Sequence, residues 1–130
     1  MLQRDYFIRL IEEFMAAVQR FLEKDEARRT DDDLRDLYRQ YVGSYDQLRN
    51  LTVEEALDYA RDVWAADRRM ARLEMLAELW YAEGSYKLKP LRDVLLDKAF
   101  RLYDYVDSHS GNYSLSRKAR MRHIKELTEA

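Results

Sequence analysis

The residue types that most often carry out chemistry are sparse in this sequence, and their spacing does not bring them together. The two histidines, His109 and His123, lack the i, i+3 or i, i+4 relationship that would place two metal ligands on one helical face. The acidic run 31–33 lacks the alternating ligands and the glycine of a calcium loop, and it suits the first turn of a helix instead. Because the chain has no cysteine, it offers neither a thiolate ligand nor a thiol nucleophile. We therefore assign no catalytic, metal or cofactor residue and favour a non-enzymatic protein.

Basic residues gather near the C-terminus, where five of them precede Glu126 without an intervening acid. Lys118, Arg122 and Lys125 recur at spacings of four and three, which places them on one face of a helix. This basic face either solvates a terminal helix, whose last turn favours positive charge, or binds an acidic partner or nucleic acid. We favour the first role and keep the second as an alternative.

A second group combines arginine with tyrosine, the residue types enriched at binding hot spots. Arg69 and Arg72 fall near the expected start of a helix, where positive charge opposes the helix dipole and needs compensation. Tyr59 and Tyr81 lie beside the apolar stripes of their helices rather than on them. We predict that these four residues line one solvent-accessible groove that binds a protein or peptide; the alternative is that acids such as Asp67 neutralise the arginines.

Helices must position these side chains, because apolar residues recur at spacings of three and four along most of the chain and no strand pattern competes. The second stripe, over residues 30–50, has Thr30 or Asp31 as its cap and contains Gly43, which favours a close backbone approach or a local kink. We predict one all-α domain over residues 1–130, with about six helices stacked as antiparallel hairpins at approximately residues 2–50, 52–84 and 90–128.

The boundary between the third and fourth helices is the least clear one. Thr52 and Glu55 form a capping box that starts the third helix. Asp67 is the expected cap of the fourth helix, with a break over residues 65–68. The apolar phase almost runs through this break, so a single helix over residues 52–83 is the alternative.

The later helices carry stronger signals. Trp80 falls on a core stripe and should be almost wholly buried. Gly84 is expected to end its helix in the left-handed conformation, and Pro90 to begin the next one. Ser114 or Ser116 should cap the last helix.

Composition sets the remaining expectations. The 130 residues include 47% hydrophobic and 37% charged residues, which suits one folded domain with solvated helix faces. The net charge of −2 supplies no general attraction to nucleic acid or anionic lipid. Apolar runs such as residues 63–66 fall far short of the ~20 residues of a membrane span. We expect a cytoplasmic protein with a protein or peptide partner and leave homo-oligomerisation open.

Two resemblances add to these expectations. The fourth and fifth helices resemble a tetratricopeptide repeat in a Leu-small pair, aromatic residues, an inter-helix glycine and a later small residue: Leu76-Ala77, Trp80, Gly84, Tyr86 and Ala99. Their turn at residues 87–90 is about three residues longer than the repeat pattern has.

The whole chain is also similar to a family of uncharacterised small bacterial all-helical proteins, through Gln3-Arg4-Asp5-Tyr6, Ile11-Glu12, Tyr113-Ser114 and Arg117. Together the two resemblances imply a short tetratricopeptide-like solenoid that acts as an interaction module. The alternative is a small-molecule-binding or enzymatic domain that uses a carboxylate–tyrosine pocket.

Overall fold

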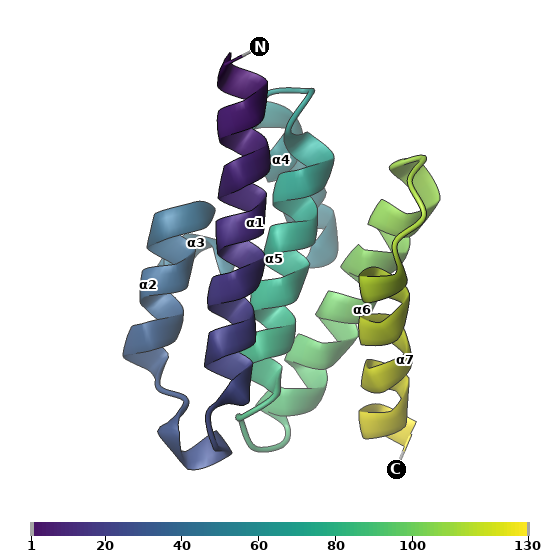
Figure 1. Cartoon of the computed structure of the whole chain (residues 1–130). Coiled ribbons are helices and arrows are strands. Elements are labelled where there is room, and N and C mark those ends of the chain that lie inside the picture. The colour runs from purple at the N-terminus through teal and green to yellow at the C-terminus, as the bar shows by residue number, and fades with distance from the viewer. Residues whose placement is uncertain (1, 130) are drawn as a thin grey trace.

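The computed structural model describes residues 2–129, with side chains from Tyr6 onward, so most of the Gln3-Arg4-Asp5-Tyr6 motif lies outside the described side chains. Over that range the chain forms seven α-helices, one short 3₁₀ helix and no strand (Figure 1), which confirms the all-α class. The elements are α1 (Leu2–Glu23), η1 (Glu26–Arg28), α2 (Asp31–Tyr41), α3 (Tyr45–Leu48), α4 (Val53–Val63), α5 (Arg69–Gly84), α6 (Leu91–His109) and α7 (Leu115–Glu129). None of the helices in this range is long and apolar enough to cross a membrane.

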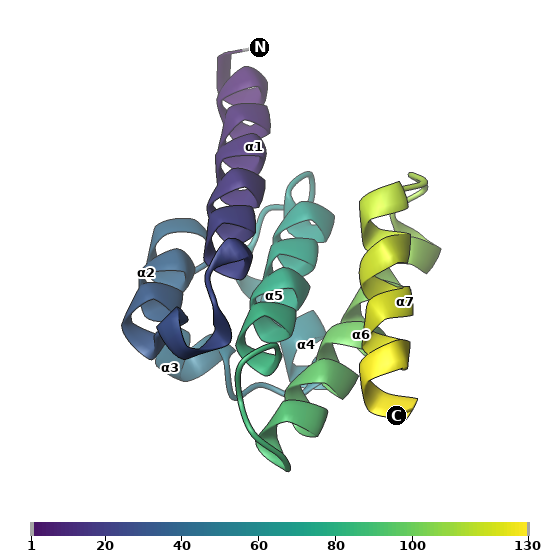
Figure 2. The same ribbon diagram turned by 60° about the horizontal axis from the view of Figure 1, so that its bottom comes forward.

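Helix α5 lies at the centre of the fold. Helices α1, α2, α4 and α6 all pack against it, and α7 packs on α6 beside it (Figures 1 and 2). Every residue from 75 to 84 is buried, so α5 is enclosed on all sides over its last ten residues. A helix buried all round is typical of the interior of a helical protein. The remaining helices therefore form a shell, and their outward faces supply the surface.

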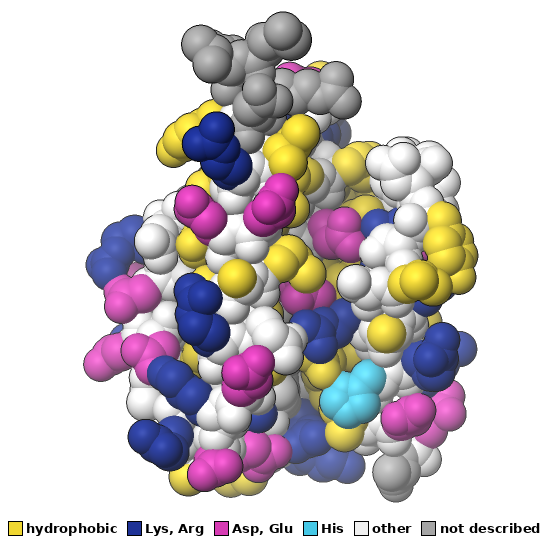
Figure 3. Space-filling model, in the orientation of Figure 1, with side chains coloured by type: hydrophobic (Ala, Val, Ile, Leu, Met, Phe, Trp, Pro, Cys, Tyr) yellow, Lys and Arg dark blue, Asp and Glu magenta, His cyan; other side chains and the backbone are white. Residues whose placement is uncertain are grey.

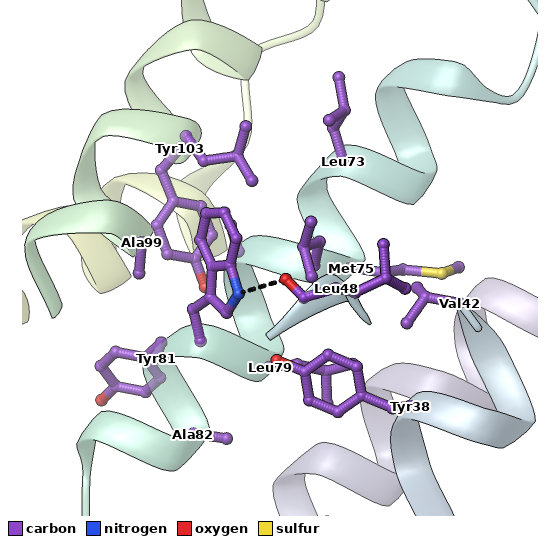
Figure 4. Close-up of a cluster of buried hydrophobic side chains, with 14 of the residues drawn as sticks. Tyr38, Val42, Leu48, Leu73, Met75, Leu79, Tyr81, Ala82, Ala99 and Tyr103 are labelled. Carbon is purple, nitrogen blue, oxygen red and sulfur yellow. Dashed lines mark hydrogen bonds between the residues drawn. The ribbon is translucent and has the colours of Figure 1, made fainter. Parts of the chain in front are cut away.

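The core around α5 is built on Trp80, which is 0% exposed, as predicted from its stripe. Its indole Nε1 donates a hydrogen bond of 3.3 Å to the carbonyl oxygen of Leu48 at the end of α3, the dashed line in Figure 4. Tyr38, Tyr81 and Tyr103 surround the same region and are also buried (Figure 4). The indole thus fills space and gives a second hydrogen bond to a carbonyl oxygen that also accepts one of 3.4 Å from the backbone N–H of Leu51.

Local capping explains most helix starts. Thr30 accepts a hydrogen bond from the backbone of Asp33, and Ser114 accepts one from Arg117, so each begins the following helix as predicted. Thr52 and Glu55 form the predicted capping box of α4.

The predicted break between the third and fourth helices is also present, because α4 ends at Val63 and α5 begins at Arg69. The prediction that Asp67 caps α5 is wrong. The N-cap is Arg68, whose side chain makes no capping hydrogen bond.

Gly43 changes the helix count. Residues 30–50, predicted as one helix, form α2 and α3, so the chain has seven helices rather than six. At Gly43 φ is +143°, a conformation that costs glycine little and strains other residues. The kink that the sequence left open is therefore a full break, and Ser44 restarts the chain by capping α3.

Gly84 differs from its predicted role. It is the last residue of α5 and does not have a positive φ, so the left-handed ending is wrong. A Cβ atom at this position would lie 2.8 Å from Cδ2 of Leu96, closer than carbon atoms pack. Glycine is needed here because α6 crosses directly over the end of α5. Helix α6 itself begins at Leu91, one residue after Pro90.

Candidate functional site

The two arginines of the predicted groove bind the ends of neighbouring helices. Arg69 donates hydrogen bonds to the carbonyl oxygens of Ala60 and Trp64, at 2.9 and 3.1 Å, at the C-terminal end of α4. Arg72 donates to the carbonyl oxygen of Tyr41, the last residue of α2. Carbonyl groups in a last helical turn carry the negative end of the helix dipole and attract positive charge. Both guanidinium groups therefore compensate helix dipoles of α4 and α2, and neither needs the acids, such as Asp67, that were the alternative.

The two tyrosines of that groove do not share an exposed surface. Tyr59 is half-buried and packs edge-on against Trp64, with ring centres 5.2 Å apart. Tyr81 is only 4% exposed, because the guanidinium of Arg120 lies 4.7 Å above its ring. The Tyr81 hydroxyl lies 2.6 Å from Nδ1 of His123 on α7. The expectation that Tyr81 lines a solvent-accessible groove is therefore wrong, since α7 covers it.

The basic face of α7 is partly neutralised. Lys118 forms an ion pair of 2.6 Å with Asp107 at the end of α6. The Nζ atom of Lys125 lies 5.4 Å above the ring of Phe100. Arg122 is exposed and makes no side-chain contact of either kind within the described residues. Helix α7 thus presents one free arginine where the spacing predicted a face of three basic residues.

Sequence reasoning did not single out Glu83, whose carboxylate is fully buried at the end of α5. Arg49 donates to both of its oxygens, at 3.1 and 2.9 Å, and the Tyr45 hydroxyl donates a third hydrogen bond of 2.9 Å. Burial, reinforced by this carboxylate, raises the pKa of Tyr45 to about 12. A buried carboxylate with this many donors has its hydrogen-bonding capacity satisfied, and here it fastens α3 to α5.

A second buried group fastens α7. Glu78 accepts hydrogen bonds from the Tyr103 hydroxyl and from Arg120, whose Nε lies 3.1 Å away. Arg117, only 3% exposed, forms ion pairs with Glu74 at 3.2 Å and with Asp107 at 3.0 Å. Burial raises the pKa of Glu74, although the nearby Arg117 opposes that shift.

Figure 3 shows the surface above this second group, hollowed between α5 and α7 and carrying charges of both signs. Both buried groups contain the carboxylate and tyrosine chemistry of the enzymatic alternative. Each buried carboxylate, however, already binds an arginine of the chain, so the groups join helices and leave no carboxylate oxygen turned to a ligand.

Open hollows lie instead on both sides of α6, and Phe100 lines the two of them. The hollow between α4 and α6 has a volume of about 360 Å³ and is lined by Val53, Glu54, Leu57, Phe100, Arg101, Asp104, Tyr105, Ser108 and His109. The hollow between α6 and α7 has a volume of about 400 Å³ and is lined by Asp93, Asp97, Phe100, Ile124, Lys125, Thr128 and Glu129. We call the residues lining these two hollows the α6 face.

Along the middle of the α6 face, Asp93, Asp97, Phe100 and Asp104 follow one another at spacings of four, three and four, so they form one stripe on the helix. Asp97 and Asp104 are exposed and have no ion-pair partner among the described residues. One carboxylate oxygen of Asp93 is buried without a hydrogen bond, and the other lies 3.9 Å from Lys89. The spacing of this stripe is visible in the sequence, but acids at such spacings are typical of any solvent-exposed helix face.

The α6 face concentrates negative charge. Five carboxylates and two cations line its hollows, a net charge of −3, whereas the whole chain carries −2. Both cations are already engaged, since Arg101 forms an ion pair of 2.7 Å with Glu54 and Lys125 lies over Phe100. The free charge at this surface is therefore acidic. No group of acidic or histidine side chains in the described part of the chain is arranged to hold a metal ion.

Comparison of the chain with protein-family models, with curated proteins and with solved structures found no match. The geometry of the α6 face therefore carries the functional argument.

Proposed function

We propose that this chain is a non-enzymatic interaction module that binds a segment of another protein along the α6 face. The observation that supports it is the half-buried ring of Phe100, which lies between two open hollows. An aromatic residue in such a place offers a large apolar contact at low entropic cost, as interface anchors do. Sites for small molecules are usually concave and enclose most of their ligand, whereas these hollows are open and lie side by side.

The chemistry elsewhere in the chain is consistent with this proposal. Buried Glu78 and Glu83 are each bound by an arginine, and Arg69 and Arg72 are held by backbone carbonyls. These polar groups explain how the helices stay together. Asp97 and Asp104 of the α6 face, by contrast, have no ion-pair partner among the described residues. We further propose, on the sequence motifs, a tetratricopeptide-like hairpin arrangement and a bacterial cytoplasmic setting.

Site-specific photocrosslinking in the producing cells tests the proposal. A benzophenone amino acid replaces exposed Asp97, and a control chain carries it at exposed Glu12 on α1. We expect a discrete protein adduct from position 97 and none from position 12. Phe100→Ala should reduce the adduct at least fivefold, because it removes the anchor.

A second variant distinguishes loss of binding from loss of the fold. Ser108 is exposed and lines the hollow, so Ser108→Arg fills the hollow without touching the core and should also reduce the adduct. Ile8→Ala, at a 44% exposed isoleucine on α1 that lines neither hollow, is the matched control and should leave the adduct unchanged. An adduct that survives both Phe100→Ala and Ser108→Arg would rule out the α6 face as the binding surface.

A further inference from the structure

We infer that the segment bound by the α6 face is a basic amphipathic helix, which lays its apolar side on Phe100 and directs lysine or arginine to the surrounding carboxylates. This inference rests on the proposed function and names its partner class. It follows from three properties of the face: its unpaired charge, its apolar floor and its shape.

The charge selects a cationic partner. Asp97 and Asp104 flank Phe100 on one helical stripe, and Glu129 of α7 lines the same hollow as Asp97. None of these three acids has an ion-pair partner among the described residues. Asp93 and Asp97 are four residues apart, a spacing at which like charges on a helix repel one another, so the empty face carries an electrostatic cost that a cation would relieve. The same charge opposes nucleic acid and anionic lipid, whose phosphates it would repel.

The floor requires that the partner also be apolar. Leu57 of α4 and Tyr105 of α6 are half-buried beside Phe100, and Val53 lies beneath them. A purely basic, extended segment would leave these side chains in contact with water. A helix with one apolar and one basic face would cover these apolar side chains and also reach the surrounding carboxylates, as amphipathic helices do in hydrophobic grooves.

The shape favours a helix over a strand. Both hollows follow seams between α6 and a neighbouring helix, and no strand edge is present in the described chain to extend. A helix can place its side-chain ridges into the groove between two helices at the usual packing distance. The apolar residues of the partner should therefore recur at spacings of three and four.

A designed peptide provides the probe. A fluorescein-labelled 18-residue helix with leucine on one face and lysine on the other is titrated against the full chain, and fluorescence anisotropy gives Kd. Its twin carries glutamate at every lysine position. We expect only the lysine peptide to bind, with an affinity that falls as salt rises, because exposed charge pairs are screened.

Variants of the chain locate the binding. Asp97→Asn with Asp104→Asn should raise Kd by about 2- to 30-fold, the range for two exposed charge pairs. The control pair Glu12→Gln with Glu13→Gln removes two exposed charges from α1 and should leave Kd unchanged. Phe100→Ala should weaken the lysine peptide at every salt concentration, whereas the aspartate variants should act mainly at low salt.

Four outcomes would overturn the inference. If the glutamate peptide binds as well as its twin, charge does not select the partner. If the lysine peptide does not bind while the crosslink from position 97 still depends on Phe100, the partner class is wrong and the interaction function stands. If the peptide does not bind and the crosslink does not depend on Phe100, both proposals are wrong. If sedimentation shows that the chain self-associates and that Phe100→Ala makes it monomeric, the occupant is a second copy.

Discussion

Lys98 has an environment that is uncommon for a lysine. Its Nζ atom donates to the carbonyl oxygens of Arg49 and Leu51, each at 2.8 Å, and lies 4.3 Å above the ring of Trp80. No carboxylate forms an ion pair with it among the described residues. Burial therefore dominates and lowers the pKa of Lys98 to about 8.

We expect Lys98 to titrate near pH 8 in the folded chain, well below the 10.5 of an ordinary lysine side chain. Carbon-13 NMR of the lysine Cε atoms resolves this difference, and Lys98→Met assigns the shifted signal. A Lys98 signal that titrates near pH 10.5 would show that the amine is solvated and that its contacts with the two carbonyl groups are not maintained.

The same shift predicts a pH dependence of stability. In the unfolded chain Lys98 keeps its proton up to about pH 10.5, so between pH 8 and 10 the unfolded state binds more protons than the folded state. The Lys98 contribution to the free energy of unfolding should therefore rise with pH in this window. Urea unfolding of the wild type and of Lys98→Met across pH 8–10 measures it, and a difference between them that is independent of pH would contradict the lowered pKa.

Trp80 is the largest fully buried side chain of the core. Trp80→Ala should lower the free energy of unfolding by about 3–5 kcal/mol, because the cavity and the lost apolar contact both add to the cost. Urea unfolding followed by circular dichroism measures the change. A loss below about 1 kcal/mol would mean that the core collapses around the site and that Trp80 does not organise it.

At the scale of the elements, the closest approach is that of α5 and α6 at Gly84. Gly84→Ala would normally favour a helix, but here the new methyl group would meet Leu96 at 2.8 Å. We expect a net loss of about 1–3 kcal/mol from overpacking. In a Leu96→Ala background the same substitution should cost less, because the obstructing atoms are gone, and equal costs in the two backgrounds would contradict the close crossing.

The elements also show what the sequence could and could not predict. Helix starts at Thr30, Thr52 and Ser114 were predictable because a cap acts within three residues of itself. The break at Gly43 was left open, since the same residue serves close packing inside a helix and a turn between helices. The positive φ of Gly43 shows that it forms a turn between two helices, and this φ depends on how α3 packs against the rest of the fold.

The site residues were harder to predict because their partners are distant in sequence. Arg72 binds the end of α2, and Glu83 binds Arg49, pairings that no local pattern contains. The stripe of Asp93, Asp97, Phe100 and Asp104 is present in the sequence, but its hollows exist only because α4 and α7 pack on either side of it.

At the scale of the molecule, α7 is held largely by polar contacts, and its only buried residues are Arg117 and Ile124. Asp107 is central to this attachment, because it binds both Arg117 and Lys118. The hydrogen bond from Lys118, together with that from Arg117, holds the pKa of Asp107 below its usual value.

These ion pairs predict that the stability of the folded chain falls at acidic pH. A carboxylate whose pKa is lowered by folding contributes stability above its unfolded pKa, near 3.8, and loses it as the pH falls through the folded value. The stability advantage of the wild type over Asp107→Asn should therefore be full at pH 7 and shrink below about pH 4. Thermal unfolding of both chains from pH 7 to pH 2 measures it; an advantage that persists at pH 2 would mean that the ion pairs do not stabilise α7.

We expect this molecule to bind its partner along the α6 face, and NMR mapping locates the binding surface residue by residue. The full chain, labelled with nitrogen-15, is titrated with the amphipathic lysine peptide while its backbone amide signals are followed. We expect the largest shifts at residues of the three helices that border the two hollows: Leu57, Asp97, Phe100, Tyr105 and Thr128. Largest shifts on α1 and α2, or shifts spread evenly over the chain, would contradict it.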